Sequence, residues 1–307
     1  MDDSERMALL KHFVGLTEEI SRGDYDRAHE IFALTNGSQG DATVEELAEA
    51  FGMMLVQVEA REFYLEQIID KLKETNMRLE EALRKVELLE NIKTHLSKFV
   101  PYSVKSLIEI NPEAPDLKKH DREITVLFLD VAGYTRMSEN VDHNEMNYLI
   151  ERYFSAFLDD IHLNNGDINE TAGDGLMIIF QQEKPVHHAV NAVTTALMIH
   201  DKARSINKGE SGRHEPIIIN IGINSGVCSV GSTCLEGISG TRWTYTASGP
   251  VTNIAARLGA LATNGQIYVG EETHCCVQGK FNLRPAGMHE LKNVSRLVPV
   301  YEVIHLG

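Results

Sequence analysis

Apolar residues in one stretch of the N-terminal third recur in steps that alternate between four and three. This spacing is the heptad repeat of a coiled coil, in which one apolar seam faces a partner helix. Asn76 occupies a seam position, where a buried asparagine fixes the register and favours a parallel dimer. We therefore predict a parallel coiled coil over residues 59–100; the alternative is a single amphipathic helix packed on its own domain. The seam comprises Leu65, Ile69, Leu72, Asn76, Leu79, Leu83 and Val86.

The seam changes phase where it continues towards the C-terminus. Two steps of three follow each other from Leu83 through Val86 to Leu89, and the seam continues as Ile92, Leu96 and Phe99. Such a stammer locally overwinds a coiled coil. Two interpretations stay open, a place where a signal changes the twist of the coil and a passive correction of phase.

The residues before the coil predict a small helical region. The stretches GDYDRAHEIF and DATVEELAEAFGMMLVQVE favour two helices, joined by a polar connector at residues 36–40. The segment Val44 to Phe51 resembles the second helix of a HAMP signalling module. We therefore expect residues 1–58 to form a HAMP-like regulatory region.

The pattern changes to alternating strands and helices after a linker at residues 101–121, which contains Pro112 and Pro115. The order over residues 122–307 begins strand, helix, strand, turn, strand, helix, strand, which is the βαββαβ plan of ferredoxin-like domains. The fold class predicted is thus α+β, with an N-terminal helical region. Residues 233–243 are expected to form a loop or arm. The predicted elements are strands at 124–129, 168–171, 176–180, 217–224, 266–269 and 299–304, and helices at 144–163, 186–205 and from Pro250.

Composition narrows the range of partners. Lys and Arg number 29 and Asp and Glu 45 among 307 residues, a net charge of −16, so a broad basic face for nucleic acid or an anionic membrane is not expected. No apolar run approaches the roughly 18 residues needed to span a bilayer, and the acidic start MDDSERMALL is unlike a signal peptide. These features predict a cytoplasmic protein. His187 and His188 are expected to form a solvated cap at a helix start.

Two aspartates carry the candidate chemistry. Asp130 follows an apolar strand in LFLDVAGYT, and Asp174 lies in the turn of ETAGDGLMIIF. In a βαββαβ sheet the strands that carry them are central neighbours, so both carboxylates can emerge side by side at one end of the sheet. A carboxylate pair suits Mg²⁺, which keeps waters and takes substrate phosphates as further ligands. The pair therefore predicts a site for a metal–triphosphate complex.

Five ordered motifs resemble the catalytic domain of class III adenylate and guanylate cyclases: FLDVAGYTRMSE, ETAGDGLMIIF, INSGVCSVG, YTASGPVTNIAARL and LKNVSRLVPVYEV. The resemblance covers about residues 124–305 and implies a head-to-tail homodimer with each active site between two domains. It implies that Asp130 and Asp174 bind two Mg²⁺ or Mn²⁺ ions per site. It also implies that Asn253 orients the ribose, Arg257 holds the α-phosphate, and Lys292 binds the triphosphate.

Two further positions are implied to recognise the purine, Glu170 and Thr246. A carboxylate accepts hydrogen bonds from both N1–H and the N2 amine of guanine, whereas the N1 acceptor of adenine would oppose Glu170. Thr246 can donate to guanine or accept from adenine. GTP is therefore favoured over ATP as the substrate, and regulation through the N-terminal coil by an unknown upstream signal or protein is expected.

Two alternatives of function remain. The chain could be an adenylate cyclase, or a non-catalytic module that senses a nucleotide and dimerises. The presence of Asp130, Asp174, Asn253 and Arg257 in one chain favours an active homodimer. A diguanylate cyclase is disfavoured because the sequence has no GGDEF-like turn.

Overall fold

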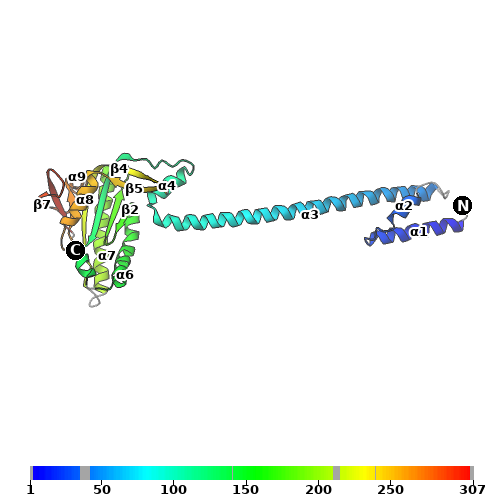
Figure 1. The fold of residues 1–307 in the computed structure, drawn as a ribbon, viewed down its shortest axis with the longest axis horizontal. Coiled ribbons are helices and arrows are strands. Elements are labelled where there is room, and N and C mark those ends of the chain that lie inside the picture. Colours follow the sequence, from blue (N-terminus) through cyan, green and yellow to red (C-terminus); the bar gives the residue numbers. More distant parts are fainter. Residues whose placement is uncertain (1–2, 35–41, 140, 210–214, 239, 305–307) are drawn as a thin grey trace. The chain divides into compact units, whose positions relative to one another are not determined.

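The computed structural model describes residues 3–34, 42–139, 141–209, 215–238 and 240–304 (Figure 1). The chain divides into two compact units, Met1–Ile92 and Lys93–Gly307. The expected connector at 36–40 lies outside the described residues. In the part of the chain that is described, no helix combines the length and the apolar character that crossing a membrane requires.

The N-terminal unit is helical, as its sequence pattern predicts. It contains α1 (Asp3–Ser21), α2 (Ala28–Leu34) and most of α3 (Ala42–Leu96). A small core buries Phe13, Leu16, Ile31 and Ala48. The ring of Phe13 meets that of Phe51 edge-on, with 5.6 Å between centroids. Phe51 ends the HAMP-like segment, so this part of α3 packs on α1 while the rest of the helix does not share that core.

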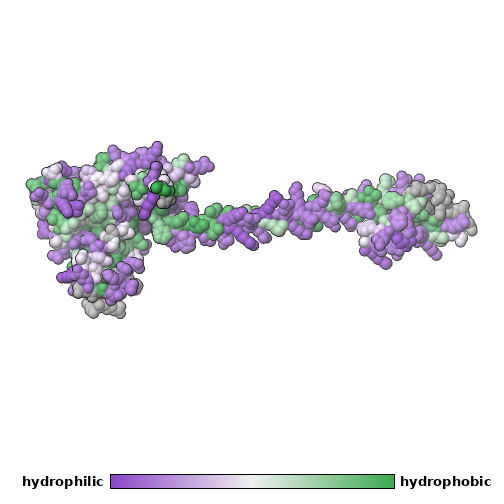
Figure 2. Space-filling model, viewed as in Figure 1, coloured by the Kyte–Doolittle hydropathy of each residue, from purple (hydrophilic) through white to green (hydrophobic). Residues whose placement is uncertain are grey.

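The seam of α3 is exposed in the single chain. Its apolar side chains from Leu65 to Leu96 have exposed fractions between 45% and 64%, and Figure 2 shows the surrounding helix surface as mainly hydrophilic. An uninterrupted helix of 55 residues is compatible with a coiled-coil segment. The parallel dimer itself stays a prediction.

The C-terminal unit confirms the α+β, ferredoxin-like plan. Its sheet has the order β2-β3-β1-β4-β6-β8-β7, and β5 pairs with β4. The predicted strands and helices are all present, and the first half of the expected linker is a helix, α4. The elements are η1 (Ser97–Phe99), α4 (Tyr102–Ile110), β1 (His120–Val131), α5 (Tyr134–Ser138), α6 (His143–Leu163), β2 (Gly166–Ala172), β3 (Gly175–Phe180), α7 (Pro185–Gly209), β4 (Ile219–Gly237), β5 (Gly240–Ser248), α8 (Pro250–Leu261), β6 (Ile267–Gly270), α9 (Glu271–Val277), β7 (Leu283–Glu290) and β8 (Leu297–Val303).

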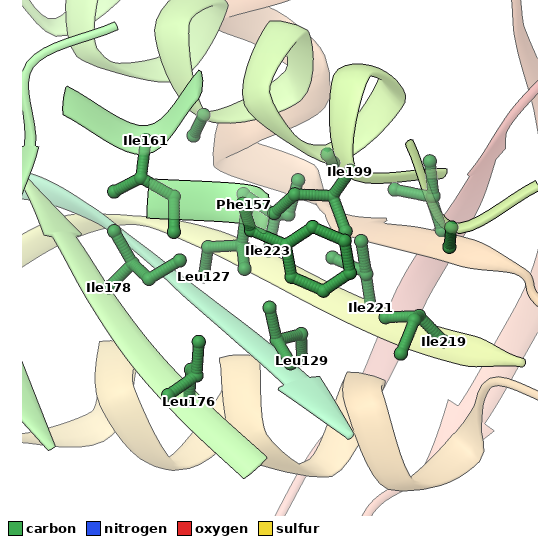
Figure 3. Close-up of a cluster of buried hydrophobic side chains, with 14 of the residues drawn as sticks. Leu127, Leu129, Phe157, Ile161, Leu176, Ile178, Ile199, Ile219, Ile221 and Ile223 are labelled. Atoms are coloured by element: carbon green, nitrogen blue, oxygen red, sulfur yellow. The ribbon is translucent and has the colours of Figure 1, made fainter. Parts of the chain in front are cut away.

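The sheet buries both of its faces. On one face Leu127, Leu129 and Ile221 pack with Phe157 of α6 and with α7 (Figure 3). On the other face Val126 and Met177 belong to a second cluster that includes residues of α8. Residues of β1 thus alternate between two cores, which explains why its sequence reads as a continuous apolar run.

Helix α8 lies directly on β4 because position 222 has no side chain. A Cβ atom at Gly222 would stand 2.0 Å from the Gly259 nitrogen and 2.3 Å from the Ala255 oxygen, both backbone atoms of α8. Non-bonded atoms do not approach so closely, so any larger residue would push the helix off the strand. Gly222 therefore sets the distance between α8 and the sheet.

The expectation for His188 is wrong, whereas His187 is exposed as expected. His188 is fully buried, because the first turn of α7 packs against the sheet. Its Nδ1 lies 2.7 Å from Thr125 Oγ1, which also contacts Ser225 Oγ at 2.7 Å; Ser225 in turn contacts Thr273 Oγ1 at 2.8 Å. Burial lowers the pKa of His188 to about 4. A neutral histidine thus belongs to a buried polar chain that joins β1, β4, α7 and α9.

The predicted arm at 233–243 is part of a two-stranded ribbon. Strand β4 continues past its expected end at Asn224 to Gly237, and β5 pairs with it antiparallel from Ser248 back to Gly240. Thr246 on β5 lies opposite Gly231. The ribbon therefore places one of the two candidate purine-contacting residues on a paired strand.

Candidate active site

The two candidate aspartates meet at one end of the sheet. Strands β1 and β3 pair antiparallel with Asp130 opposite Gly175, so the β2–β3 turn lies beside the end of β1. The Val131 N–H donates to the Asp174 backbone oxygen at 3.1 Å, which holds the turn against the strand. Asp130 and Asp174 line the same cavity, and the Asp174 carboxylate raises the pKa of Asp130. The sequence prediction that these two side chains lie together is therefore matched by the geometry.

The electrostatics of the pair are unfavourable without a cation. Burial, followed by the charge and the hydrogen bond of Asp174, raises the pKa of Asp130 to about 6. Two carboxylates this close ionise together only at a cost in free energy, so one keeps its proton to a higher pH than an isolated aspartate does. A divalent cation would relieve the same repulsion, and the pair therefore fits a metal.

The donor set also indicates what else the metal would need. In the described residues no group of three or more His, Cys, Asp or Glu side chains is arranged to hold a metal ion. Mg²⁺ commonly binds to one or two carboxylates and completes its octahedron with water and substrate phosphates. The pair of Asp130 and Asp174 is thus suited to a metal that arrives with a phosphorylated ligand.

A cavity of about 410 Å³ opens beside the aspartates. Its floor comes from β1 and β3, and Glu170 of β2 lines it together with Asp130 and Asp174. Helix α8 contributes only small residues to the wall, Ala256, Gly259 and Ala260. These three residues were not predicted as part of the site, although their small size at spacings of three and four is visible in NIAARLGALA. They leave room for a ligand next to the carboxylates.

The other candidate residues lie outside the lining of this cavity. Asn253 and Arg257 are exposed on α8, four residues apart and therefore on one face of the helix. Thr246 is half-buried on β5, and Lys292 is exposed after β7. One chain thus brings together Asp130, Asp174 and Glu170, and it leaves the remaining four on the surface.

Two polar residues before Glu170 make contacts that the sequence analysis missed. The Asp167 carboxylate accepts hydrogen bonds from the backbone N–H groups of Tyr102 and Ser103, at 2.8 and 3.0 Å, and so caps the start of α4. The Asn169 side chain donates to the Tyr245 backbone oxygen at 2.9 Å. No local pattern reveals such partners, because they lie 65 and 76 residues away in the chain.

Comparison with known proteins identifies the class of catalytic domain to which this fold belongs. The family model described as "Adenylate and Guanylate cyclase catalytic domain" matches residues 117–302. The chain belongs to this family, the class III nucleotidyl cyclases.

Individual relatives agree with that assignment. Adenylate cyclase 1 of Rhizobium meliloti (strain 1021) is 26% identical over 187 residues, which cover 60% of this chain and 28% of the relative. The chain therefore matches less than a third of the length of that curated protein.

Two solved structures are equally similar to the chain. The adenylyl cyclase CyaB from P. aeruginosa has a TM-score of 0.57 and 26% identity, covering 62% of this chain and 97% of that one. The guanylyl cyclase Cya2 has the same TM-score and identity, covering 62% and 95%. Since one structure is named for each purine, overall similarity does not distinguish ATP from GTP, and the choice depends on individual residues.

Proposed function

We propose that the chain converts a purine nucleoside triphosphate, preferentially GTP, to the 3′,5′-cyclic monophosphate and pyrophosphate. The observation that carries this proposal is the pair of adjacent carboxylates, Asp130 and Asp174, in a cavity of about 410 Å³ on a cyclase fold. The pair supports the binding of two Mg²⁺ or Mn²⁺ ions together with the phosphates of the substrate.

In the proposed reaction the ribose 3′-oxygen bonds to the α-phosphorus, the bond from that phosphorus to the β-phosphate oxygen breaks, and the hydroxyl proton passes to water. When bound, the metals supply positive charge that lowers the pKa of the 3′-hydroxyl and stabilises the departing pyrophosphate. Asn253 orients the ribose by hydrogen bonding. The guanidinium of Arg257 holds the α-phosphate as charge develops there, and Lys292 attracts the triphosphate.

A homodimer would complete each site. Asn253 and Arg257 are exposed and do not line the cavity that holds Asp130. A second copy packed head to tail could present them to the aspartates of the first, which accounts for their separation in one chain. The exposed seam of α3 supports a parallel pairing of the two copies.

Complementation tests this arrangement directly. Asp130→Ala and Arg257→Ala should each inactivate the enzyme when expressed alone. Co-expression should restore about one quarter of the wild-type activity, because half of randomly assembled dimers are mixed and each mixed dimer has one intact site. If co-expression of the two variants restored no activity, Asp130 and Arg257 would have to act within a single chain.

Product identification tests the reaction and the base. Purified protein is incubated with Mg²⁺ or Mn²⁺ and each of ATP, GTP, CTP and UTP, and the products are resolved by mass. We expect cyclic GMP to dominate, and Glu170→Lys to reverse the preference because an ammonium donates to adenine N1 and repels the guanine donors. Dominant cyclic AMP in the wild type would contradict the guanine contact, and no product from a folded dimer would favour the non-catalytic module.

Regulation by the N-terminal region has a physical route. Asp167 caps α4, the helix that follows α3 in the chain, and lies on β2 three residues before Glu170. A movement of α4 would therefore act on the strand that carries Glu170. We expect deletion of residues 1–100 to change the basal rate or the dimer affinity; identical values in the truncated protein would contradict regulation by this region.

A matched pair of variants separates this route from ordinary stabilisation. Asp142 caps α6 by accepting from Asn144 and Glu145, as Asp167 caps α4. Asp167→Ala and Asp142→Ala should both cost about 1 kcal/mol of stability. Only Asp167→Ala should reduce the difference in rate between full-length and truncated protein. An equal effect of the two variants on that difference would exclude the route through Asp167.

A further inference from the structure

Strand β2 contains a bulge at the residue before Glu170. Its pairing with β3 shifts register between Ile168 and Glu170, so Asn169 has no partner opposite it in the ladder. The side chain of Asn169 instead donates its amide hydrogen to the backbone oxygen of Tyr245, at 2.9 Å. Among the described residues β5 pairs only with β4, so there this bond is a side-chain link between two strands that share no ladder.

The linked residues immediately precede both candidate purine-contacting positions. Glu170 follows Asn169, and Thr246 follows Tyr245. Consecutive Cα atoms are about 3.8 Å apart across a trans peptide, so the hydrogen bond joins the chain one residue from each position. Whatever fixes the separation of Asn169 and Tyr245 therefore also limits the separation of the Glu170 carboxylate and the Thr246 hydroxyl.

We propose that Asn169 is a positioning residue for base selection, which sets the spacing between Glu170 and Thr246 through its hydrogen bond to β5. The inference rests on the proposed function, because it assumes that these two residues contact the purine. Selection between purines depends on the placement of donors and acceptors, and a displaced group loses its discrimination while the base still fits.

The loss of stability caused by burying the Asn169 amide supports its role as a positioning residue. Asn169 is half-buried, and within the described residues its Oδ1 is buried with no hydrogen-bond partner. An unsatisfied buried oxygen destabilises the folded state, whereas an aliphatic side chain in a strand would not. The donated bond to Tyr245 is the interaction that an aliphatic residue could not replace.

The test compares Asn169→Leu with a matched control in the full-length protein. Gln182 makes the same kind of contact in the same unit: its amide donates to the Asn165 backbone oxygen at 3.0 Å, and its Oε1 is also buried without a partner. The ratio of kcat/KM for the preferred purine triphosphate to that for the other is measured in the wild type, Asn169→Leu and Gln182→Leu. Melting temperatures are measured alongside.

We expect Asn169→Leu to reduce the preference about five- to tenfold, the effect of one hydrogen bond on discrimination. Gln182→Leu should leave it within about twofold, although both variants lose similar stability. A second variant, Asn169→Asp, keeps the shape but faces the Tyr245 carbonyl with an oxygen, and should reduce the preference at least as much. An unchanged ratio in both Asn169 variants, with the same loss of stability as the control, would overturn the inference.

A double mutant tests whether Asn169 acts through Glu170. In a Glu170→Gln background, Asn169→Leu should change the ratio by less than about twofold, because coupled residues are not additive. A full additional effect in that background would show that Asn169 acts by another route and contradict the proposal.

The proposed guanine contact and the inference about Asn169 are contradicted by different results. A wild type that prefers ATP contradicts the guanine contact, yet Asn169→Leu must still reduce that preference if Asn169 sets the spacing. A wild type that converts neither triphosphate would overturn the proposed function and this inference together.

Discussion

Asp130→Asn should make the protein more stable while removing its activity. The pKa of Asp130 rises from its ordinary 3.8 to about 6 because of burial and the neighbouring Asp174. At 1.36 kcal/mol for each pKa unit this corresponds to about 3 kcal/mol, which partial exposure to solvent reduces to about 1–2 kcal/mol. An amide carries no charge and would relieve this cost.

The pH dependence of the effect follows from the direction of the shift. A carboxyl whose pKa is raised by folding contributes most stability below its unfolded pKa, and that contribution is lost as the pH rises through about 6. The wild type therefore carries the full penalty at pH 7.5 and little of it at pH 4.5. The gain from Asp130→Asn should be present at pH 7.5 and shrink towards zero at pH 4.5.

Urea unfolding in EDTA measures the gain, and the cyclase rate is measured separately with Mg²⁺. We expect about 1–2 kcal/mol of added stability at pH 7.5 and a loss of at least about 100-fold in rate. Asp159→Asn is the control, because this carboxylate is exposed on α6. The reasoning is refuted if Asp130→Asn is no more stable than the wild type at pH 7.5, or if the gain is equal at pH 4.5.

Three further changes have defined outcomes. Gly222→Ala should destabilise the protein by about 3 kcal/mol or more in urea unfolding, because its Cβ would strike the backbone of α8; Gly209→Ala, whose Cβ meets no atom within 4 Å, should not. Between pH 7 and pH 5 the wild type should lose about 1–2 kcal/mol of stability relative to His188→Gln, because folding holds the pKa of His188 near 4 against an ordinary 6.5; the same pH dependence in both proteins would exclude His188 as the source. Asn76→Leu should raise the melting temperature of the proposed coiled-coil dimer while relaxing its oligomeric state, which light scattering would detect as mixed oligomers; a lower melting temperature would argue against a seam position.

Sequence periodicity predicted most of the fold, for identifiable reasons. The run Ile124–Leu129 is buried on both faces of a central strand, so its apolar character could be read directly. Strand β7 was missed because its residues alternate weakly and only partly bury. Helix α9 was missed because it has seven residues, too few to show a helical period.

The sequence predicted those parts of the candidate site that local motifs determine, and not the contacts between segments distant in the chain. Asp130 and Asp174 could be placed side by side because strand order determines their separation. The buried position of His188 could not be predicted, because its partner Thr125 lies 63 residues away in the chain and becomes a neighbour only when α7 packs on the sheet. The contact from Asn169 to β5 depends on a bulge in β2, and nothing in the local sequence predicts that bulge.

The contact at Gly222 restricts how this enzyme could be switched. At Gly222 backbone meets backbone, so α8 has no compressible side chain beneath it at this point and little freedom to slide or tilt over β4. Asn253 and Arg257 are therefore carried on a helix that behaves as part of the sheet. A regulatory movement in the N-terminal region therefore has to act elsewhere than between α8 and β4, either on β2 through the Asp167 contact with α4 or on the relative placement of the two copies in the proposed homodimer.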